Sequence, residues 1–395
     1  MSLGVLNFSW STTLRIATYN VLNFPEAMGV QRQFHLFSVL NYIKPDILVL
    51  QEVKDRQGFD IFRDSIIARM SSDFSSAPFY DGPDTDNGLF YCADKVEFLS
   101  VQYIPAGVRD IAEYRMRFRD SGYEFDVYSV HFKSSQGPEN EAERQEQAIR
   151  LRRRIDSLPA SRYFLVLGDF NIYYSDEPAY QVLLDTVEYR RCIKDPKGIS
   201  GVWHENSNLA YLHTQSTRLN QLPDGGAGGG LDDRFDMILC SENFLSRSGL
   251  FLMIDSYTIF GNDGEHFDLA VNEGYNNTVP GEIADALYYA SDHLPIYVEI
   301  TDEPNQEVAE PVIKIVPNPL KNKGWIHLPW CEDFLSARVT MMNILGQRVF
   351  QRKTSNPDGI RITEDELAPG IYFVQVEILT KYVKYHYQTK LAVVE

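Results

Sequence analysis

Residues 163–171, YFLVLGDFN, show the pattern that decides the fold class. Five apolar or aromatic residues run without alternation, which is typical of a strand covered on both faces. Gly168 follows, and then Asp169 and Asn171 place a carboxylate and a carboxamide at the end of the strand. On its own, this pattern also fits a strand followed by an ordinary Asx turn. A catalytic interpretation therefore depends on whether other strands end in the same way.

The chain before this stretch alternates strand, helix and strand. Residues 14–20, LRIATYN, predict a strand that ends in Asn20. Residues 31–44 carry apolar side chains at helical spacing, and residues 46–51, DILVLQ, predict a second buried strand with Glu52 at its end. Short joins between such elements indicate an α/β fold.

Polar side chains also mark the ends or starts of later predicted strands. In an α/β sheet, such positions converge on one crevice. One polar residue at a strand end is weak support for a site, because every buried strand must end in something polar. The placement of several such residues at strand ends or starts is much stronger support. The candidate residues are Asn20, Glu52, His131, Asp169, Asn171, Asp236, Asp292 and His293.

Other stretches give structural expectations without chemistry. Residues 139–158 predict a long helix, acidic at its start and ending near RLRRR, and this polarity favours a solvated arginine face over a phosphate-binding patch. Residues 223–233, PDGGAGGGLDD, lack the ending of a P-loop and predict a mobile loop beside the functional site. Residues 256–289 are predicted to be rich in loops.

The acidic stretch DGPDTDNG, residues 81–88, partly matches a calcium-binding loop. Asp84, Asp86 and Gly88 fit that pattern, but the glutamate expected at its far end is replaced by Lys95. An ordinary loop is the main interpretation, and a structural Ca²⁺ is the minority one.

The length and charge of the chain predict two domains. A chain of 395 residues is too long to fold around one ordinary hydrophobic core. The polar stretch TDEPNQEVAEP predicts a linker at residues 302–311, between a catalytic domain at residues 1–301 and a small all-β module at residues 312–395. From Pro311 onward, eleven Lys and Arg face eight Asp and Glu, so +3 of the net charge of -18 lies there and -21 lies before it. An acidic body attracts cations and disfavours tight general binding of nucleic acid.

Composition argues against several other classes of protein. The four cysteines, Cys92, Cys192, Cys240 and Cys331, form no CxxC pair, so neither a zinc site nor a disulfide scaffold is indicated. No apolar run approaches the roughly 18 residues that span a bilayer. Residues 1–13, MSLGVLNFSWSTT, have no basic n-region, so a signal peptide is expected to be absent or already removed.

Six motifs, taken in order, resemble the endonuclease/exonuclease/phosphatase superfamily. They are TYN, LQE, SVHFKS, LGDFN, RFD and SDHLP, and the resemblance covers about residues 12–301. It implies a four-layer α-β-β-α sandwich, with two mixed sheets packed face to face and helices outside. VHFKS followed by an Arg/Gln-rich helix is most similar to secreted bacterial nucleases.

The resemblance also implies a metal site. By similarity, Glu52 is the main ligand of Mg²⁺ or Mn²⁺, and Asn20 and Asp292 lie at or near the metal. Carboxylate and carbonyl oxygens suit these hard cations, and no cluster of soft ligands competes.

The remaining residues of the motifs take catalytic roles by similarity. His293 is the expected general base, and Asp236 would fix its tautomer. Asp169 would orient the attacking water or support a second metal, and Asn171 would hold a phosphate oxygen. His131 would donate to the phosphate or to the leaving group.

Arg115 and Lys133 are weaker candidates for phosphate binding. The family often has an Arg-Pro pair ahead of the histidine strand, but here Met116 follows Arg115. An exposed strand arginine is nearly as good an interpretation, and Lys133 has a comparable alternative.

The C-terminal part resembles the sorting domains of type IX secretion cargo. VPNPLKNKG, MNILGQRV and LAPGIYFVQV carry this resemblance over roughly residues 312–395. It implies recognition by the type IX secretion machinery, a secreted or surface-attached protein, and a tail that is removable after export. The alternative is a generic β-sandwich that binds carbohydrate or packs on the enzyme.

The sequence favours a secreted, metal-dependent phosphodiesterase that cleaves extracellular DNA or RNA. The alternative is the same site acting on a smaller phosphoester, as a phosphatase or a sphingomyelinase-like phospholipase C. A third hypothesis, a catalytically inactive adhesin, is disfavoured because every expected site residue is present. The sequence leaves the oligomeric state open.

Overall fold

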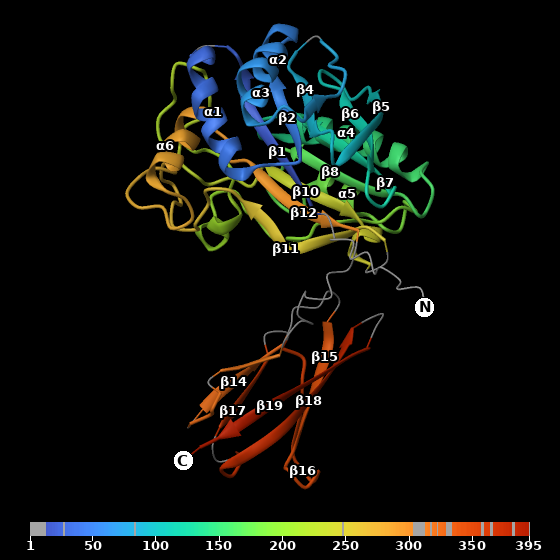
Figure 1. Cartoon of the computed structure of the whole chain (residues 1–395), viewed down its shortest axis with the longest axis vertical. Coiled ribbons are helices and arrows are strands. Elements are labelled where there is room, and N and C mark those ends of the chain that lie inside the picture. The colour runs from blue at the N-terminus through green and yellow to red at the C-terminus, as the bar shows by residue number, and fades with distance from the viewer. Residues whose placement is uncertain are drawn as a thin grey trace, which may run out of the picture. The chain divides into compact units, whose positions relative to one another are not determined.

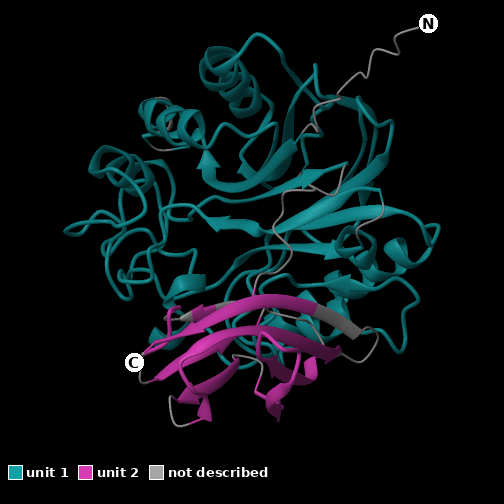
Figure 2. Cartoon of the chain, turned by 60° about the horizontal axis from the view of Figure 1, so that its bottom comes forward, with its two compact units in different colours: residues 1–304 teal, residues 305–395 magenta. Residues whose placement is uncertain are grey.

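The computed structural model describes residues 13–302, except 27, 83 and 247–248, and residues 313–394, except 317, 322, 329–333, 357–358, 364–365 and 381–383. The chain divides into two compact units, residues 1–304 and residues 305–395, which Figure 2 shows in different colours. Apart from Asp302, the predicted linker lies outside the described residues, as do residues 1–12.

The first unit contains two six-stranded mixed sheets, named here sheet A and sheet B. Sheet A has the order β11-β12-β1-β2-β4-β3, and its central pair, β1 and β2, is parallel. Its strands are β1 (Thr13–Phe24), β2 (Ile47–Val53), β3 (Phe74–Ser76), β4 (Asp86–Cys92), β11 (Phe251–Ile259) and β12 (Ile296–Thr301).

Sheet B repeats this plan with a different part of the chain. Its order is β5-β6-β7-β8-β10-β9, and its central pair, β7 and β8, is again parallel. Its strands are β5 (Val96–Ile104), β6 (Ile111–Phe118), β7 (Glu124–His131), β8 (Tyr163–Asp169), β9 (Ile193–Lys194) and β10 (Asp236–Ser241).

Helices cover the outer face of each sheet (Figure 1). In each parallel pair a helix forms the crossover: α1 (Gly29–Ile43) joins β1 to β2, and α4 (Pro138–Asp156) joins β7 to β8. Pro138 starts α4, where its missing N–H costs nothing, and glutamates in the first turn favour the helix dipole. The other helices are α2 (Arg56–Phe62), η1 (Arg63–Ile67), α3 (Ala68–Met70), α5 (Pro178–Leu184), η2 (Ser207–Leu212), η3 (Glu242–Leu245) and α6 (Gly281–Ala290).

Three apolar clusters hold these layers together. The middle cluster lies between the sheets, where Ile16 and Val49 of sheet A share one core with Val127 and Leu165 of sheet B. The outer clusters pack sheet A against α1 and α6, and sheet B against α4 and α5. This arrangement confirms the four-layer α-β-β-α sandwich.

Two features of this unit were not expected from the sequence. Residues 256–289 are rich in loops, as predicted, but they also include part of β11 and nearly the whole of the unpredicted helix α6. The predicted solvated arginine face includes the exposed Arg153 but not Arg152, which is fully buried, donates to the carbonyl of Asp185 and lies 4.6 Å from the ring centroid of Tyr189. Burial of the arginine stem among apolar groups is not visible in the charge pattern.

The second unit is all-β in its described residues, as predicted. A sheet of order β13-β14-β17 and a sheet of order β16-β15-β18-β19 share an apolar core that includes Ile326, Val339 and Val374. The strands are β13 (Lys314–Val316), β14 (Lys323–His327), β15 (Phe334–Met342), β16 (Arg348–Thr354), β17 (Gly359–Thr363), β18 (Gly370–Thr380) and β19 (Lys384–Val393).

Candidate active site

Strand register places three of the predicted site residues in one row across sheet B. His131 on β7 pairs with Asp169 on β8, and Asp169 pairs with Asp236 on β10. All three are buried. Three neighbouring strands thus present an imidazole and two carboxylates at the same end of the sheet, where β7 and β8 finish and β10 begins.

Sheet A contributes Asn20 from β1 and Glu52 from β2. The backbone of Glu52 has a φ of 59°, a left-handed conformation that a non-glycine residue rarely adopts. The β1–β2 register also shifts after the Asn20–Gln51 pair. Such an irregularity redirects a side chain at the end of a strand, and here the result is that Glu52 reaches Asn20.

Gly168 allows Asp169 to approach the neighbouring strand. Its φ is +132°, and a Cβ atom at this position would lie 2.1 Å from the carbonyl oxygen of Val130 on β7. Beyond it, Asn171 has a φ of 52°, and its N–H donates to Oδ1 of Asp169 at 3.0 Å. The Asx turn considered from the sequence is therefore present, and it orients the carboxylate of Asp169.

A buried polar chain connects the two sheets below these residues. The Thr18 hydroxyl donates to Gln51 Oε1 at 2.9 Å, and Gln51 Nε2 donates to Ser129 Oγ at 2.9 Å. Ser129 in turn donates to Asn87 Oδ1 at 2.6 Å. These bonds join β1 and β2 of sheet A to β7 of sheet B, which fixes the spacing of the sheets where the site residues project.

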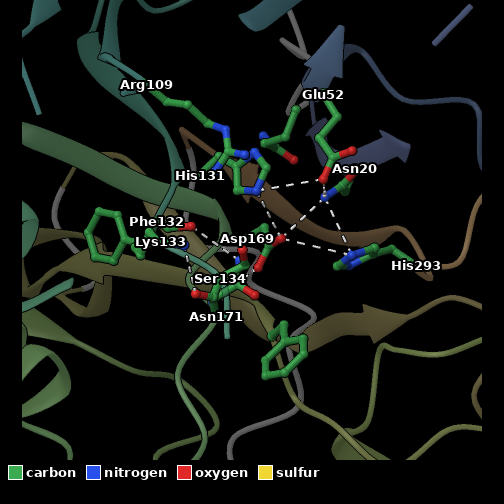
Figure 3. A network of polar contacts seen from close by, with 12 residues as sticks. Asn20, Glu52, Arg109, His131, Phe132, Lys133, Ser134, Asp169, Asn171 and His293 are labelled. Atoms are coloured by element: carbon green, nitrogen blue, oxygen red, sulfur yellow. Dashed lines mark hydrogen bonds and ion pairs between the residues drawn. The ribbon is translucent and has the colours of Figure 1, made fainter. Parts of the chain in front are cut away.

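The side chain of Asn20 lies at the centre of the site (Figure 3). Its Nδ2 is 3.0 Å from Glu52 Oε1, 3.2 Å from Asp169 Oδ2 and 3.4 Å from His293 Nε2. His131 Nε2 lies 3.6 Å from Glu52 and 3.5 Å from Asp169. Five of the predicted residues thus converge within a few ångströms.

His293 forms a buried dyad with Asp236. His293 Nδ1 lies 2.7 Å from Asp236 Oδ2. On the opposite side of the ring, the Gln215 amide nitrogen lies 2.7 Å from His293 Nε2 and also donates to Asp292 Oδ2 at 3.0 Å. In the neutral form of His293, Nε2 accepts from Gln215 and Nδ1 carries the proton toward Asp236, which is the tautomer that a general base requires.

Burial and neighbouring charges shift the pKa values of the site in different directions. Burial raises the pKa of Asp169 to about 7, and that of Glu52 is also raised, by burial and by Asp292. Burial, together with Arg109 and His293, holds the pKa of His131 well below its usual range, so this ring is neutral. Burial alone would lower the pKa of His293, but the carboxylates of Asp236, Asp292 and Asp169 outweigh burial and raise this pKa well above its usual range.

The donor atoms suit a hard divalent cation. Ligand atoms of Glu52, His131 and Asp169 lie within 4.8 Å of one another. Oδ1 of Asp292 is buried and has no hydrogen-bond partner among the described residues, so this oxygen is available to a cation. Asn20 lies beside these groups: its Oδ1 accepts from Leu22 N at 3.0 Å, its Nδ2 donates to Glu52 and Asp169, and its role as a metal ligand stays a prediction.

Two buried arginines hold the helix that precedes Asp292 and His293. Arg32 Nε donates to the carbonyl of Ala290 at 2.9 Å, and Arg218 Nε donates to the carbonyl of Tyr288 at 2.8 Å. The two guanidinium groups satisfy carbonyl acceptors at the end of α6, and their positive charge interacts favourably with the helix dipole. The end of α6, and with it the following site residues, is therefore fixed.

Arg109, which the sequence did not indicate, lies at the site, whereas Arg115 is held elsewhere. Arg115 is half-exposed on β6, where Glu124 accepts from its guanidinium at 3.1 and 2.6 Å, and its contact with phosphate stays a prediction. Arg109, in the loop before β6, points toward His131 (Figure 3). Lys133 lies beside the site, with Nζ 3.2 Å from the carbonyl oxygen of Ser134.

Other acidic groups near the site hold partners of their own. Asp84 pairs with Arg109 at 2.9 Å, and Asp86 accepts from the N–H of Gly82 at 2.8 Å. A Ca²⁺ in this loop stays a prediction. A further group of potential ligands, His204, Asp232 and Asp233, was not expected from the sequence.

Comparison with known families identifies the first unit. The model of the Endonuclease/Exonuclease/phosphatase family matches residues 17–293, which is more than half of the chain. The chain belongs to the endonuclease/exonuclease/phosphatase family. As a member of this family, it is a phosphoester hydrolase that depends on divalent metal.

Solved structures similar to this chain include one with a TM-score above 0.5. D. rerio TDP2, solved with a single-strand DNA product, is 19% identical with a TM-score of 0.51, and the match covers 73% of this chain and 99% of that one. An endonuclease/exonuclease/phosphatase protein from Bacteroides vulgatus is 19% identical with a TM-score of 0.49, covering 74% and 100%. No protein with a curated description matches the chain.

The second unit is a sorting domain for export. The model of the secretion system C-terminal sorting domain matches residues 314–387. The enzyme is therefore cargo of the type IX secretion machinery, exported across the outer membrane to the cell surface or the medium. Within the described residues, no helix combines the length and the apolar character needed to span a bilayer.

Proposed function

We propose that this enzyme is an Mg²⁺- or Mn²⁺-dependent phosphodiesterase that cleaves extracellular DNA or RNA. The observation that carries the proposal is the convergence of Asn20, Glu52, Asp169 and His293 in one cluster, whose contacts through polar atoms span 3.0 to 3.8 Å. D. rerio TDP2 is complexed with a single-strand DNA product, which is in keeping with a nucleic acid substrate for this chain.

Each residue of the crevice has a role in such a reaction. Glu52 and Asp292 would hold a divalent cation, which would supply neutralisation of charge on the phosphoryl oxygens. His293 takes the proton from the attacking water at Nε2, and Asp236 stabilises the resulting imidazolium through Nδ1. Asp169 orients the water. As the phosphorus–oxygen bond breaks, its electron pair goes to the leaving oxygen, which takes up a proton from His131 or from water, and N–H groups stabilise the charge that develops on the phosphate.

Those N–H groups come from three side chains. His131 is neutral, so one of its ring nitrogens donates, and Asn171 donates through its amide. Arg109 supplies the positive charge that was expected of Arg115. Lys133 lies beside the site and is the second candidate for contact with phosphate.

The activity test uses the full chain with plasmid DNA or RNA and Mg²⁺. We expect cleavage, its loss on addition of EDTA, and a fall in kcat of at least about 100-fold in His293→Ala. Glu52→Gln is expected to be inactive, whereas Glu97→Gln, which removes only a half-exposed ion pair with Arg117, keeps full activity. Full activity of Glu52→Gln would contradict the proposal.

The acidic charge favours a second candidate, hydrolysis of a smaller phosphoester. The -21 carried before Pro311 repels a polyanion at long range more than it repels a single phosphate. A panel of duplex DNA, RNA, sphingomyelin and a nucleotide, each with the Glu52→Gln variant as control, separates the two. Turnover of only the last two substrates would establish the alternative.

A further inference from the structure

The glycine-rich segment at residues 222–230 packs beneath the predicted metal site. The segment is a loop, as predicted, but Asp224 and Gly226 within it are buried. Asp224 Oδ1 lies 2.7 Å from Arg218 Nη1, and both side chains of this ion pair are fully buried. A buried charge is tolerated only with its partner, so this pair anchors the segment to the body of the unit.

Gly226 is held in close contact on three sides. A Cβ atom at this position would lie 2.6 Å from Leu22 Cδ2, 3.0 Å from Arg218 Nη1 and 3.1 Å from Asp292 Cβ. Only glycine fits this space without displacing a neighbour. The segment is therefore packed directly against the residue expected to bind the cation.

The next residue along the segment contacts the Asp292 carboxylate itself. The N–H of Ala227 donates to Asp292 Oδ2 at 2.7 Å, and Gln215 Nε2 donates to the same oxygen at 3.0 Å. Two donors on one oxygen fix the rotation of the carboxylate. The other oxygen, Oδ1, is buried and finds no hydrogen-bond partner in the part of the chain that the structure describes.

We propose that Arg218, Asp224 and the glycine-rich segment form a positioning device that orients Asp292 Oδ1 toward the divalent cation and thereby sets the affinity for it. The device acts through Ala227, and none of its own side chains touches the substrate. The inference rests on the proposed function, because it assumes that Asp292 is a cation ligand. It assigns the segment a role that its composition does not indicate.

The test measures cation binding directly, without substrate. The full chain is stripped with EDTA and dialysed, and Mg²⁺ or Mn²⁺ is titrated in a calorimeter. We expect Gly226→Ala, which displaces the segment from Asp292, to weaken binding by about 10- to 100-fold. Ala227→Pro, which removes the N–H donor, has the same expected effect, and Ala227→Ser, which keeps the N–H on an exposed residue, retains the affinity.

A second readout separates positioning from a general loss of stability. Activity of Gly226→Ala is expected to return toward the wild-type kcat when Mg²⁺ is raised about 100-fold, because only cation affinity is lost. Unchanged affinity in folded Gly226→Ala overturns the inference, and so does activity that added metal does not restore. Should Ala227→Pro not fold, Gly226→Ala decides. Absence of cation binding by the wild-type chain would instead overturn the proposed function.

Discussion

Arg109 and Arg115 form a natural test pair at the scale of single residues. Arg109 points into the crevice and pairs with Asp84, whereas Arg115 is held by Glu124 on the face of β6. We expect Arg109→Ala to lower kcat/KM by about 100-fold, because one donor to the phosphate is lost. Arg115→Ala is expected to leave kcat/KM unchanged. Steady-state kinetics on one phosphodiester substrate measures both.

The reverse result would restore the interpretation based on sequence position. A loss in Arg115→Ala with normal Arg109→Ala would mean that the ion pair with Glu124 opens when substrate binds. Circular dichroism of both variants, compared with the wild type, shows whether either change acts through the fold instead.

Glu124 gives a prediction for the dependence of stability on pH. Hydrogen bonds from Arg117 and Arg115 lower the pKa of Glu124 to about 2, below the roughly 4.3 of an unfolded chain. A carboxyl group whose pKa is lowered by folding stabilises the fold at pH values above its unfolded pKa. This contribution disappears as the pH falls from about 4 toward 2. The group is solvent-accessible, so the effect is at most about 1 kcal/mol.

Urea denaturation at two pH values measures this effect. The wild type should exceed Glu124→Gln in free energy of unfolding at pH 6, and the difference should shrink at pH 3 and in high salt. A difference that grows on acidification would show that Glu124 is not ionised in the folded chain.

At the scale of elements, Gly168 tests the close approach of β7 and β8. An alanine Cβ at this position would lie 2.1 Å from the backbone oxygen of Val130, in a conformation with a φ of +132°. We expect Gly168→Ala to lower the free energy of unfolding by at least about 1–3 kcal/mol. Gly281→Ala is the control, because Gly281 opens α6 with nothing within 4 Å of its added Cβ. Equal urea midpoints for the two variants would contradict the β7–β8 packing.

The sequence predicts correctly those elements whose burial is visible in their own residues. β2 and β8 are buried on both faces and appear as continuous apolar runs, so their existence and their polar ends were predicted correctly. α6 was missed because its short sequence, GEIADALYYA, follows a long polar stretch and gives no strong helical period. Arg152 was misjudged because its burial depends on Tyr189, which lies far along the chain.

For the site as well, the sequence identifies residues but not the contacts that depend on distant parts of the chain. The converging residues could be named because motif order gives identity, but register and side-chain direction come only from the fold. Gln215 and Arg109 were missed because neither ends a predicted strand. The role of residues 222–230 depends on a buried partner, Arg218, and composition alone favoured mobility.

At the scale of the whole molecule, the two units have separate cores and separate tasks. Three clusters lie within the first unit and one within the second. We expect a chain ending at Pro304 to keep the kcat/KM of the full chain, and to remain behind the outer membrane because it lacks the sorting domain. Fractionation and an activity assay measure both outcomes, and the same truncation with Glu52→Gln is the inactive control. Export of the truncated chain would contradict the role of the tail.

Sheet A is built from both ends of the first unit, with all of sheet B inserted between β4 and β11. Its strand β12 lies between β11 and β1, where Thr301 pairs with Thr13 and Ile296 pairs with Thr18. During synthesis on the ribosome, β1 has no such neighbour until nearly the entire unit has emerged. Asp292 and His293 immediately precede that last strand, so the site is assembled only after nearly the whole unit has been synthesised.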